Sequence, residues 1–289
     1  MAVTTEKKQK GIVRLREAGK VAVRLRFTGG AATADQFAAI ADIAKRYSGG
    51  RIHLTTRQGI EIAPVAAERA TELIADLEAR GIPVAALGAV VRGVTACPGM
   101  LCRNGVIDAQ VLAQRIDEAF RDFHGAHAKI KITVAGCPNG CPKPAEHDLG
   151  ICGIVSVTVH PEGCTGCGAC VERCKVGAIT VEGTTVRLDE NRCILCGGCA
   201  LVCPSGTLTL DEKGFRLFAG GKMGRFPRLG QTVIPRLGDV GEVIAAMGDL
   251  LETYRDRGRK GERLGETFAR TGWPEAAAVT GKPGRRSRT

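Results

Sequence analysis

The feature that most restricts how this chain can fold is a run of four cysteines that occurs twice. In each copy the spacing is C-x2-C-x2-C-x3-C, and the second copy begins 29 residues after the first. Glycine-rich turns ("CTGCGAC" and "CILCGGC") let three thiolates converge on one iron–sulfur cube, while the fourth cysteine reaches the other cube. Eight zinc-bound or structural thiols are the alternative, but zinc sites seldom show this triple run twice. The spacing therefore predicts two [4Fe–4S] clusters. Their ligands are Cys164, Cys167, Cys170 and Cys203 for one cluster and Cys193, Cys196, Cys199 and Cys174 for the other.

The segment that carries these cysteines, from about residue 155 to 210, resembles a bacterial two-cluster ferredoxin. At one position the chain departs from the ferredoxin pattern, because Lys175 and not proline follows Cys174. This departure removes no ligand. We therefore expect the segment to form a ferredoxin-like domain of its own.

Five further cysteines lie outside this segment, and four of them form two pairs in loops rich in glycine and proline. "ACPGMLC" carries Cys97 and Cys102, and "AGCPNGCPKP" carries Cys137 and Cys141. A proline after a cysteine lacks a backbone N–H and resists helix, so the second stretch is expected to be a rigid, irregular loop. Two such loops can supply a four-thiolate site, and the spacing alone leaves zinc open there. Cys152 is more typical of a small buried core residue.

Apolar spacing and capping residues predict an α+β fold for the rest of the chain. Thr33 and Gln36 form a capping-box pattern at the start of one helix. Asp108 is a candidate N-cap of a helix that precedes "KIKITV", and Asp239 is a candidate N-cap of a helix at residues 240–257. Alternation in "VAVRLRF", "RIHLTT" and "KIKITV" is typical of strands. The expected buried face of the first helix consists of Phe37, Ile40, Ile43 and Tyr47. Further helices are expected at residues 66–80 and in "GERLGETFAR", and the two terminal helices, at 240–257 and in this last stretch, are expected only to cover the sheet.

The second cysteine loop resembles the siroheme-binding signature of sulfite and nitrite reductases. The matching stretch is "KIKITVAGCPNGCPKPAEHDLGICG", and further matches are "VAVRLRFTGGAATADQF", "RIHLTTRQGIEI", "VRGVTACPG" and "GFRLFAGGKMGRFPRLG". Among members of this family, the chain looks most like anaerobic sulfite reductase C subunits and small dissimilatory-type sulfite reductases. The resemblance implies an α+β siroheme domain of the nitrite/sulfite reductase type with an inserted 2[4Fe–4S] ferredoxin domain. The expected division is 1–154 and 213–289 for the two parts of the reductase domain and 155–212 for the insertion.

The resemblance also implies that the two cysteine pairs hold a third [4Fe–4S] cluster, and that one cysteine bridges to the siroheme iron. The ligands would be Cys97, Cys102, Cys137 and Cys141, of which Cys141 matches the bridging thiolate. The first pair is C-x4-C, one residue shorter than the family pattern, so that loop must close differently at Cys102. The chain is thus expected to carry siroheme and three [4Fe–4S] clusters.

Basic residues take on roles from the same resemblance. Reduction of a small oxyanion needs cationic donors that hold the anion and supply protons. Arg57 in "HLTTRQG" matches an arginine that pairs with siroheme carboxylates, and His53 stands where some members have a further arginine. Without the resemblance, charges on a strand are more often solvated, and a lone histidine is more often a partly buried polar residue. The family's substrate-facing arginines and lysines match Arg24, Arg92, Lys129 and Lys131.

The net charge of +11 suits an anionic cofactor, but it also raises nucleic acid as a rival partner. Eight Phe, one Trp and two Tyr provide few stacking platforms, and no nucleic-acid motif occurs, so we expect no such partner. The basic tail "KPGRRSRT" is expected to be disordered. No apolar run is long enough to span a bilayer, and many cysteines without a secretion signal are typical of the reducing cytoplasm. We therefore expect a cytoplasmic protein without a membrane contact.

Two classes of function remain open. One is an enzyme that uses siroheme for the six-electron reduction of sulfite to sulfide, with electrons relayed through the ferredoxin-type clusters; nitrite is the alternative substrate. The other is a non-catalytic iron–sulfur electron-transfer subunit. The basic residues favour the enzyme, because a carrier has no need of them. No flavin or nicotinamide fingerprint occurs, so an external donor protein is expected to supply the electrons.

Assembly is the last expectation. In the family, a full siroheme site is built from two related halves, whereas this chain carries one "TTRQG", one K-x-K and one set of cysteine loops. A lone half would leave the siroheme carboxylates in water, where cationic pairing is weak. We therefore expect a homodimer, or a heterodimer with a related subunit.

Overall fold

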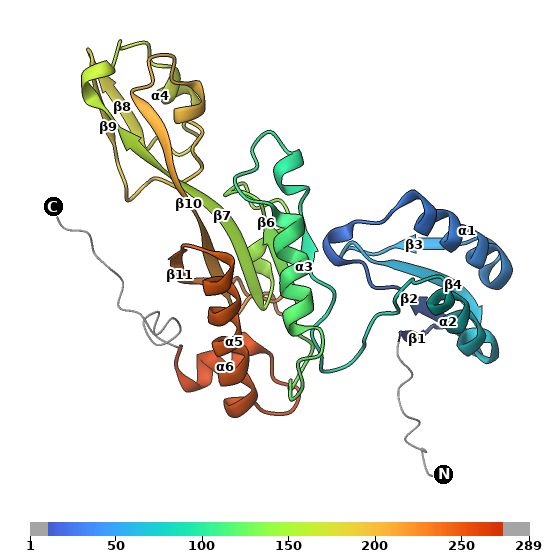
Figure 1. Cartoon of the computed structure of the whole chain (residues 1–289). Helices are drawn as coiled ribbons and strands as arrows, with labels where there is room; N and C mark the ends of the chain where they lie inside the picture. Colours follow the sequence, from blue (N-terminus) through green and yellow to red (C-terminus); the bar gives the residue numbers. More distant parts are fainter. Residues whose placement is uncertain (1–10, 274–289) are drawn as a thin grey trace.

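The computed structural model describes residues 11–273, so the first ten residues and the basic tail that we expect to be disordered lie outside the described residues. Figure 1 shows an elongated molecule with three parts in a row: an N-terminal part, a central sheet with its helices, and a small module at the far end. Within residues 11–273, no helix is both long enough and apolar enough to cross a membrane.

The N-terminal part is an antiparallel sheet of four strands in the order β1-β2-β4-β3, with two helices packed on it. The Thr33 side chain accepts a hydrogen bond from the Gln36 N–H, so the expected capping box is formed. Phe37, however, is 49% exposed, which contradicts the expected burial of the whole apolar face. The elements are β1 Ile12–Arg14, β2 Lys20–Arg24, α1 Ala34–Ser48, β3 Ile52–Leu54, β4 Ile60–Ala66 and α2 Ala70–Ala79.

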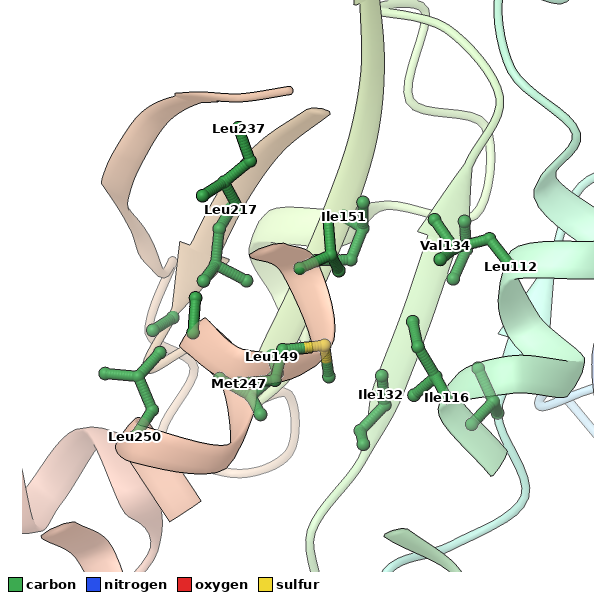
Figure 2. Close-up of a cluster of buried hydrophobic side chains, with 14 of the residues drawn as sticks. Leu112, Ile116, Ile132, Val134, Leu149, Ile151, Leu217, Leu237, Met247 and Leu250 are labelled. Atoms are coloured by element: carbon green, nitrogen blue, oxygen red, sulfur yellow. The ribbon is translucent and has the colours of Figure 1, made fainter. Parts of the chain in front are cut away.

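The central part is a mixed sheet of five strands in the order β11-β10-β7-β6-β5, in which β5, β6 and β7 are parallel. Asp108 and Asp239 cap α3 and α5 as expected, because each carboxylate accepts backbone N–H groups of the first turn. Figure 2 shows Leu112 and Ile116 of α3 beside strand β6, while Met247 of α5 lies near β7. The elements are β5 Thr95–Ala96, α3 Ala109–Phe120, β6 Ile132–Ala135, β7 Leu149–Val159, β10 Leu208–Ala219, β11 Gln231–Leu237, α5 Val240–Arg257 and α6 Leu264–Thr271.

The small module is carried by strands β7 and β10, which run from the central sheet into it without a break (Figure 1). The pairing of β7 with β10 shifts register between Leu210 and Lys213, a β-bulge at the junction of the two parts. The module adds α4 Ala169–Arg173 and the hairpin of β8 Ile179–Glu182 and β9 Thr185–Leu188. Its apolar core is separate from the other two and includes Cys170, Ile179, Val186, Cys199 and Leu208.

Candidate functional site

A cavity of about 270 Å³ lies between the N-terminal part and the start of β6. Five of the basic residues that the sequence suggested line this cavity, although they come from segments up to 107 residues apart. Arg26, two residues after the end of β2, joins them and was not expected. Among the described residues that line the cavity there is no Asp or Glu. Its basic side chains are Arg24, Arg26, Arg57, Arg92, Lys129 and Lys131.

Burial and the repulsion from neighbouring positive charges both lower the pKa values of Lys131 and Arg57. Burial, and after it the charges of Arg57, Arg263 and Lys129, lower the pKa of Lys131 from 10.5 to about 8. The pKa of Arg57 falls to about 10, first through burial and then through Arg92 and Arg263, although Asp148 opposes the shift. An anion bound in the cavity would relieve this repulsion.

Two arginines in the cavity wall are held by backbone carbonyls and keep one donor each unused. Arg57 donates from Nη2 to the Gly93 carbonyl at 2.9 Å, and Arg92 donates from Nη1 to the Ala86 carbonyl at 2.7 Å. Arg57 Nη1 and Arg92 Nε are buried and find no acceptor in the described part of the chain. Buried donors of this kind normally have a partner, and a carboxylate is the acceptor that pairs best with a guanidinium. The cavity therefore fits an anionic group that bears carboxylates.

Arg24 is held by a cross-strand contact that the sequence did not suggest. Its Nε and Nη2 donate to Glu61 Oε1 at 2.7 and 2.5 Å, and the other oxygen of Glu61 lies 3.0 Å from His53 Nδ1. Against burial, which raises it, the hydrogen bonds from His53 and Arg24 lower the pKa of Glu61. His53 thus lies beside Arg24 through Glu61, but it is not one of the residues that line the cavity.

A buried ion pair anchors the segment that carries the two lysines. Asp148 is fully buried and accepts hydrogen bonds from the Lys131 N–H at 2.7 Å and from Arg263 Nε at 2.9 Å. Arg263 is the residue that precedes α6, so this helix does more than cover the sheet. The two lysines precede β6 instead of lying within it, and Ile130 between them forms a single bridge to Val91.

The two cysteine loops outside the small module come together at the opposite end of β6. We call them the outer loops; one carries Cys97 and Cys102, and the other carries Cys137 and Cys141. Burial, and after it the nearby thiols of Cys97, Cys141 and Cys102, raise the pKa of Cys137. The shortened first loop therefore still brings Cys102 near Cys137. The Gly136 N–H donates to Cys97 Sγ at 3.0 Å, in the way that backbone amides support cluster sulfurs.

Both loops are fixed by the elements around them. Gln58 makes two hydrogen bonds to the Ala96 backbone, at 2.7 and 2.9 Å, and so ties the "TTRQG" loop to β5. Gln110 of α3 donates to the Cys97 carbonyl at 3.0 Å. No glutamine was expected to contribute, because side-chain contacts with a backbone leave no pattern in the sequence. Cys152 is buried in the sheet as expected, and burial raises the pKa of its thiol to about 12.

In the small module the eight cysteines form two crossed groups. The distal group is Cys164, Cys167, Cys170 and Cys203, and the proximal group is Cys193, Cys196, Cys199 and Cys174. The distal group lines one small cavity, and burial, Cys167 and Cys203 raise the pKa of Cys170. In the proximal group, burial, Cys196 and Cys174 raise the pKa of Cys193.

This crossing is the arrangement that the repeated spacing predicts for two clusters, because the last cysteine of each run lies with the other run. Within residues 11–273, no three His, Cys, Asp or Glu side chains are arranged to hold a single metal ion. Ligation of clusters by these twelve cysteines remains a prediction.

Two family models match this chain. Residues 87–285 match the family described as "Nitrite and sulphite reductase 4Fe-4S domain", and residues 14–80 match "Nitrite/Sulfite reductase ferredoxin-like half domain". The chain is 39% identical over 248 residues to a coenzyme F420-dependent sulfite reductase of Methanocaldococcus jannaschii, covering 85% of this chain and 39% of that protein. It is 29% identical over 176 residues to the C subunit of the anaerobic sulfite reductase of Salmonella typhimurium, covering 56% of this chain and 51% of that protein.

The chain thus spans about half or less of the length of these two relatives. The crystal structure of dissimilatory sulfite reductase I has the same fold, with a TM-score of 0.74 at 21% identity, over 92% of this chain and 70% of that one. The expected α+β fold is confirmed. Family membership rests on the match over residues 87–285, which is more than half of the chain. The chain belongs to the nitrite and sulphite reductase family.

Proposed function

We propose that this protein binds siroheme and reduces sulfite to sulfide. The observation that carries the proposal is the basic cavity, where five cationic side chains matched to family roles converge. Two of these side chains, Arg57 and Arg92, each have a buried donor without an acceptor in the described part of the chain. Siroheme carboxylates and a small oxyanion would satisfy such donors. The relatives from Methanocaldococcus and Salmonella are both sulfite reductases by name, which favours sulfite over nitrite.

The side chains of the cavity suit the proton balance of this reaction, HSO₃⁻ + 6 e⁻ + 6 H⁺ → HS⁻ + 3 H₂O. When bound, siroheme would supply the iron that takes the anion and accepts the electrons. Arg57 and Arg92 would hold carboxylates through Nη1 and Nε. Lys131, with its pKa near 8, can give up a proton and be recharged close to neutral pH. Arg24 and Lys129 would add positive charge around the anion.

Three [4Fe–4S] clusters are part of the proposal, with the cysteines divided into the outer, proximal and distal groups. The proximity of the other three outer thiols to Cys137 and the two crossed groups in the module support this assignment. An external protein would donate the electrons, and the reducing cytoplasm is the proposed location.

We also propose that each site is completed by two subunits. Lys131 precedes β6 and Cys137 follows it, and six residues of extended chain span roughly 20 Å. The basic cavity and the outer cysteine loops of one chain therefore lie apart, at opposite ends of the same strand. A second copy, or a related protein, could place its cysteine loops over this cavity.

Cofactor analysis of anaerobically purified protein tests the proposal most directly. Three clusters and one siroheme predict about 13 iron atoms and about 12 labile sulfides per chain, together with the visible absorption of an iron tetrapyrrole. Turnover is then measured with sulfite and with nitrite, using a chemical electron donor. About eight iron atoms, no tetrapyrrole and no turnover would identify an electron-transfer subunit instead. Faster reduction of nitrite would move the proposal to the alternative substrate.

A further inference from the structure

A second cavity, of about 430 Å³, lies where the small module meets the outer cysteine loops. Asn104 and Cys137 line it on the side of the central part, and Cys174 and Cys196 line it on the side of the module. Those two cysteines belong to the proximal group. The cavity lined by the distal group shares no residue with this one. The proximal group is therefore the one that faces the outer loops.

Basic side chains border this junction. Arg103, Arg173, Lys175 and Lys213 line the cavity, and among the described residues no carboxylate does so. Four positive charges thus lie between two groups of four thiols. A cluster held by four thiolates is an anion, and it becomes more negative when it is reduced.

Arg173 is the one of these four for which the structure records contacts on both sides of the junction. It ends α4, directly before Cys174. Its Nη2 lies 3.4 Å from Asn104 Oδ1, in the loop that follows Cys102. Its Nε and Cζ lie 3.5 Å from the point that a Cβ on Gly198 would occupy, between Cys196 and Cys199. The half-buried guanidinium, on the residue before Cys174, therefore lies beside the turn at residues 196–199 of the proximal group and beside Asn104 of the central part.

A fixed positive charge at this place must favour the reduced form of a cluster next to it. A guanidinium remains protonated at any working pH. The attraction between this charge and the cluster grows when the cluster gains an electron, and it is less screened in a half-buried junction than in water. Removal of the charge should lower the reduction potential of the nearest cluster and leave a distant one unchanged.

We propose that Arg173 is a positioning residue that raises the reduction potential of the proximal cluster and holds that cluster against the Cys102 loop. The inference rests on the proposed cluster ligation. It makes the proximal cluster the partner of the outer one in a one-electron transfer, in which one cluster is oxidised, the other is reduced and no atom moves. The distal cluster then faces the external donor.

The test is a redox titration of the full holoprotein, followed by electron paramagnetic resonance. We expect Arg173→Met and Arg173→Gln to lower one potential by an amount that corresponds to roughly a tenfold change in the reduction equilibrium, or about 59 mV for one electron. Arg173→Lys, which keeps the charge, should restore most of the potential. Arg187→Met is the matched control, because Arg187 is exposed on β9 and lines neither cavity of the module.

The shifted cluster is assigned in a Cys167→Ser background, which alters the signal of the distal cluster alone. The shift should remain in one of the two cluster signals that this change leaves intact. Equal potentials in the wild type and both neutral variants, an equal shift in Arg187→Met, or a shift confined to the distal signal would each overturn the inference. These potentials are measured without sulfite, so a protein that binds all clusters but fails to turn over would contradict only the proposed function.

Discussion

At the scale of single residues, the basic cavity is defined by charges that lack a carboxylate partner in its wall. Family resemblance predicted five of its six basic residues, because each of the five lies in or beside a stretch of sequence that matches a family motif. Arg26 lies in the same stretch as Arg24, but its partner Asp117 is 91 positions away, and this pair, with an Nη2 to Oδ1 distance of 2.5 Å, leaves no local pattern. Asp148 and Arg263 were missed for the same reason, at a separation of 115 positions.

The lowered pKa of Lys131 predicts how activity depends on pH. The protonated form, which attracts the anion and can donate a proton, is lost as pH rises through about 8. We expect kcat/KM for sulfite to fall above that pH, approaching tenfold per pH unit. In Lys131→Arg the guanidinium stays charged, so this limb of the profile should disappear. A limb that persists in Lys131→Arg would come from the substrate or from another group, and it would contradict the role of Lys131.

Loss of both lysines should separate cofactor binding from turnover. In the double variant Lys129→Met and Lys131→Met, we expect the siroheme spectrum to remain and kcat for sulfite to fall by about a hundredfold, because charge stabilisation and proton supply are removed together. Absorption spectra and steady-state rates measure the two effects. The control replaces Lys45 and Lys260, which are exposed and outside the cavity. Unchanged turnover would show that the family roles do not apply to these residues.

At the scale of elements, N-capping residues and the helical spacing of apolar residues predicted a helix well where the two occur together. Helix α5 spans Val240–Arg257, as expected from Asp239 and the apolar spacing. The helix expected at 66–80 begins only at Ala70, because β4 continues through Ala66 and pairs with Lys20. Phe37 is exposed because periodicity gives the face of a helix but not the extent of the surface that covers it.

The contact between α6 and the cavity can be tested through Arg263. Replacement by Met leaves Asp148 buried without its cationic partner, and we expect a loss of about 3–5 kcal/mol in the free energy of unfolding. KM for sulfite should also rise, because Asp148 fixes the backbone at Lys131. Denaturant unfolding and steady-state kinetics provide the two measurements. Arg259→Met, in the exposed connection between α5 and α6, is the control. A change no larger than that of the control would show that the pair is dispensable.

At the scale of the whole molecule, the sequence predicted the fold by resemblance but not how its parts are joined. The expected boundaries at residues 155 and 212 fall within strands β7 and β10, which both parts share. Sequence spacing marks where cysteines occur, but it carries no sign that two strands continue from one part into the next. The placement of the basic cavity and the outer loops at opposite ends of β6 likewise appears only when the chain is folded.

That separation leads to a prediction about assembly. Two inactive variants, one lacking Cys141 and the other lacking Lys129 and Lys131, are dissociated, mixed and reassembled. If identical chains share their sites, a mixed dimer contains one intact site, and up to about half of its activity should return. Activity assays before and after mixing provide the readout, and each variant carried alone through the same treatment is the control. A mixture that stays inactive would indicate self-sufficient chains or a different partner protein.

The continuity of β7 and β10 has a mechanical consequence. Many electron carriers are tethered by a pliable linker and must swing between a loading and a delivery position. Here the pairing of β7 with β10 continues from the Leu149/Ala219 pair in the central sheet to the Val159/Leu208 pair in the module. This stiff two-stranded connection fixes the module to the sheet and suppresses such swinging. Electrons must therefore cross a constant gap, and the rate of this crossing should be indifferent to the viscosity of the medium. The same two-stranded connection makes the module difficult to remove, because deleting the module would cut the two longest strands that the structure describes.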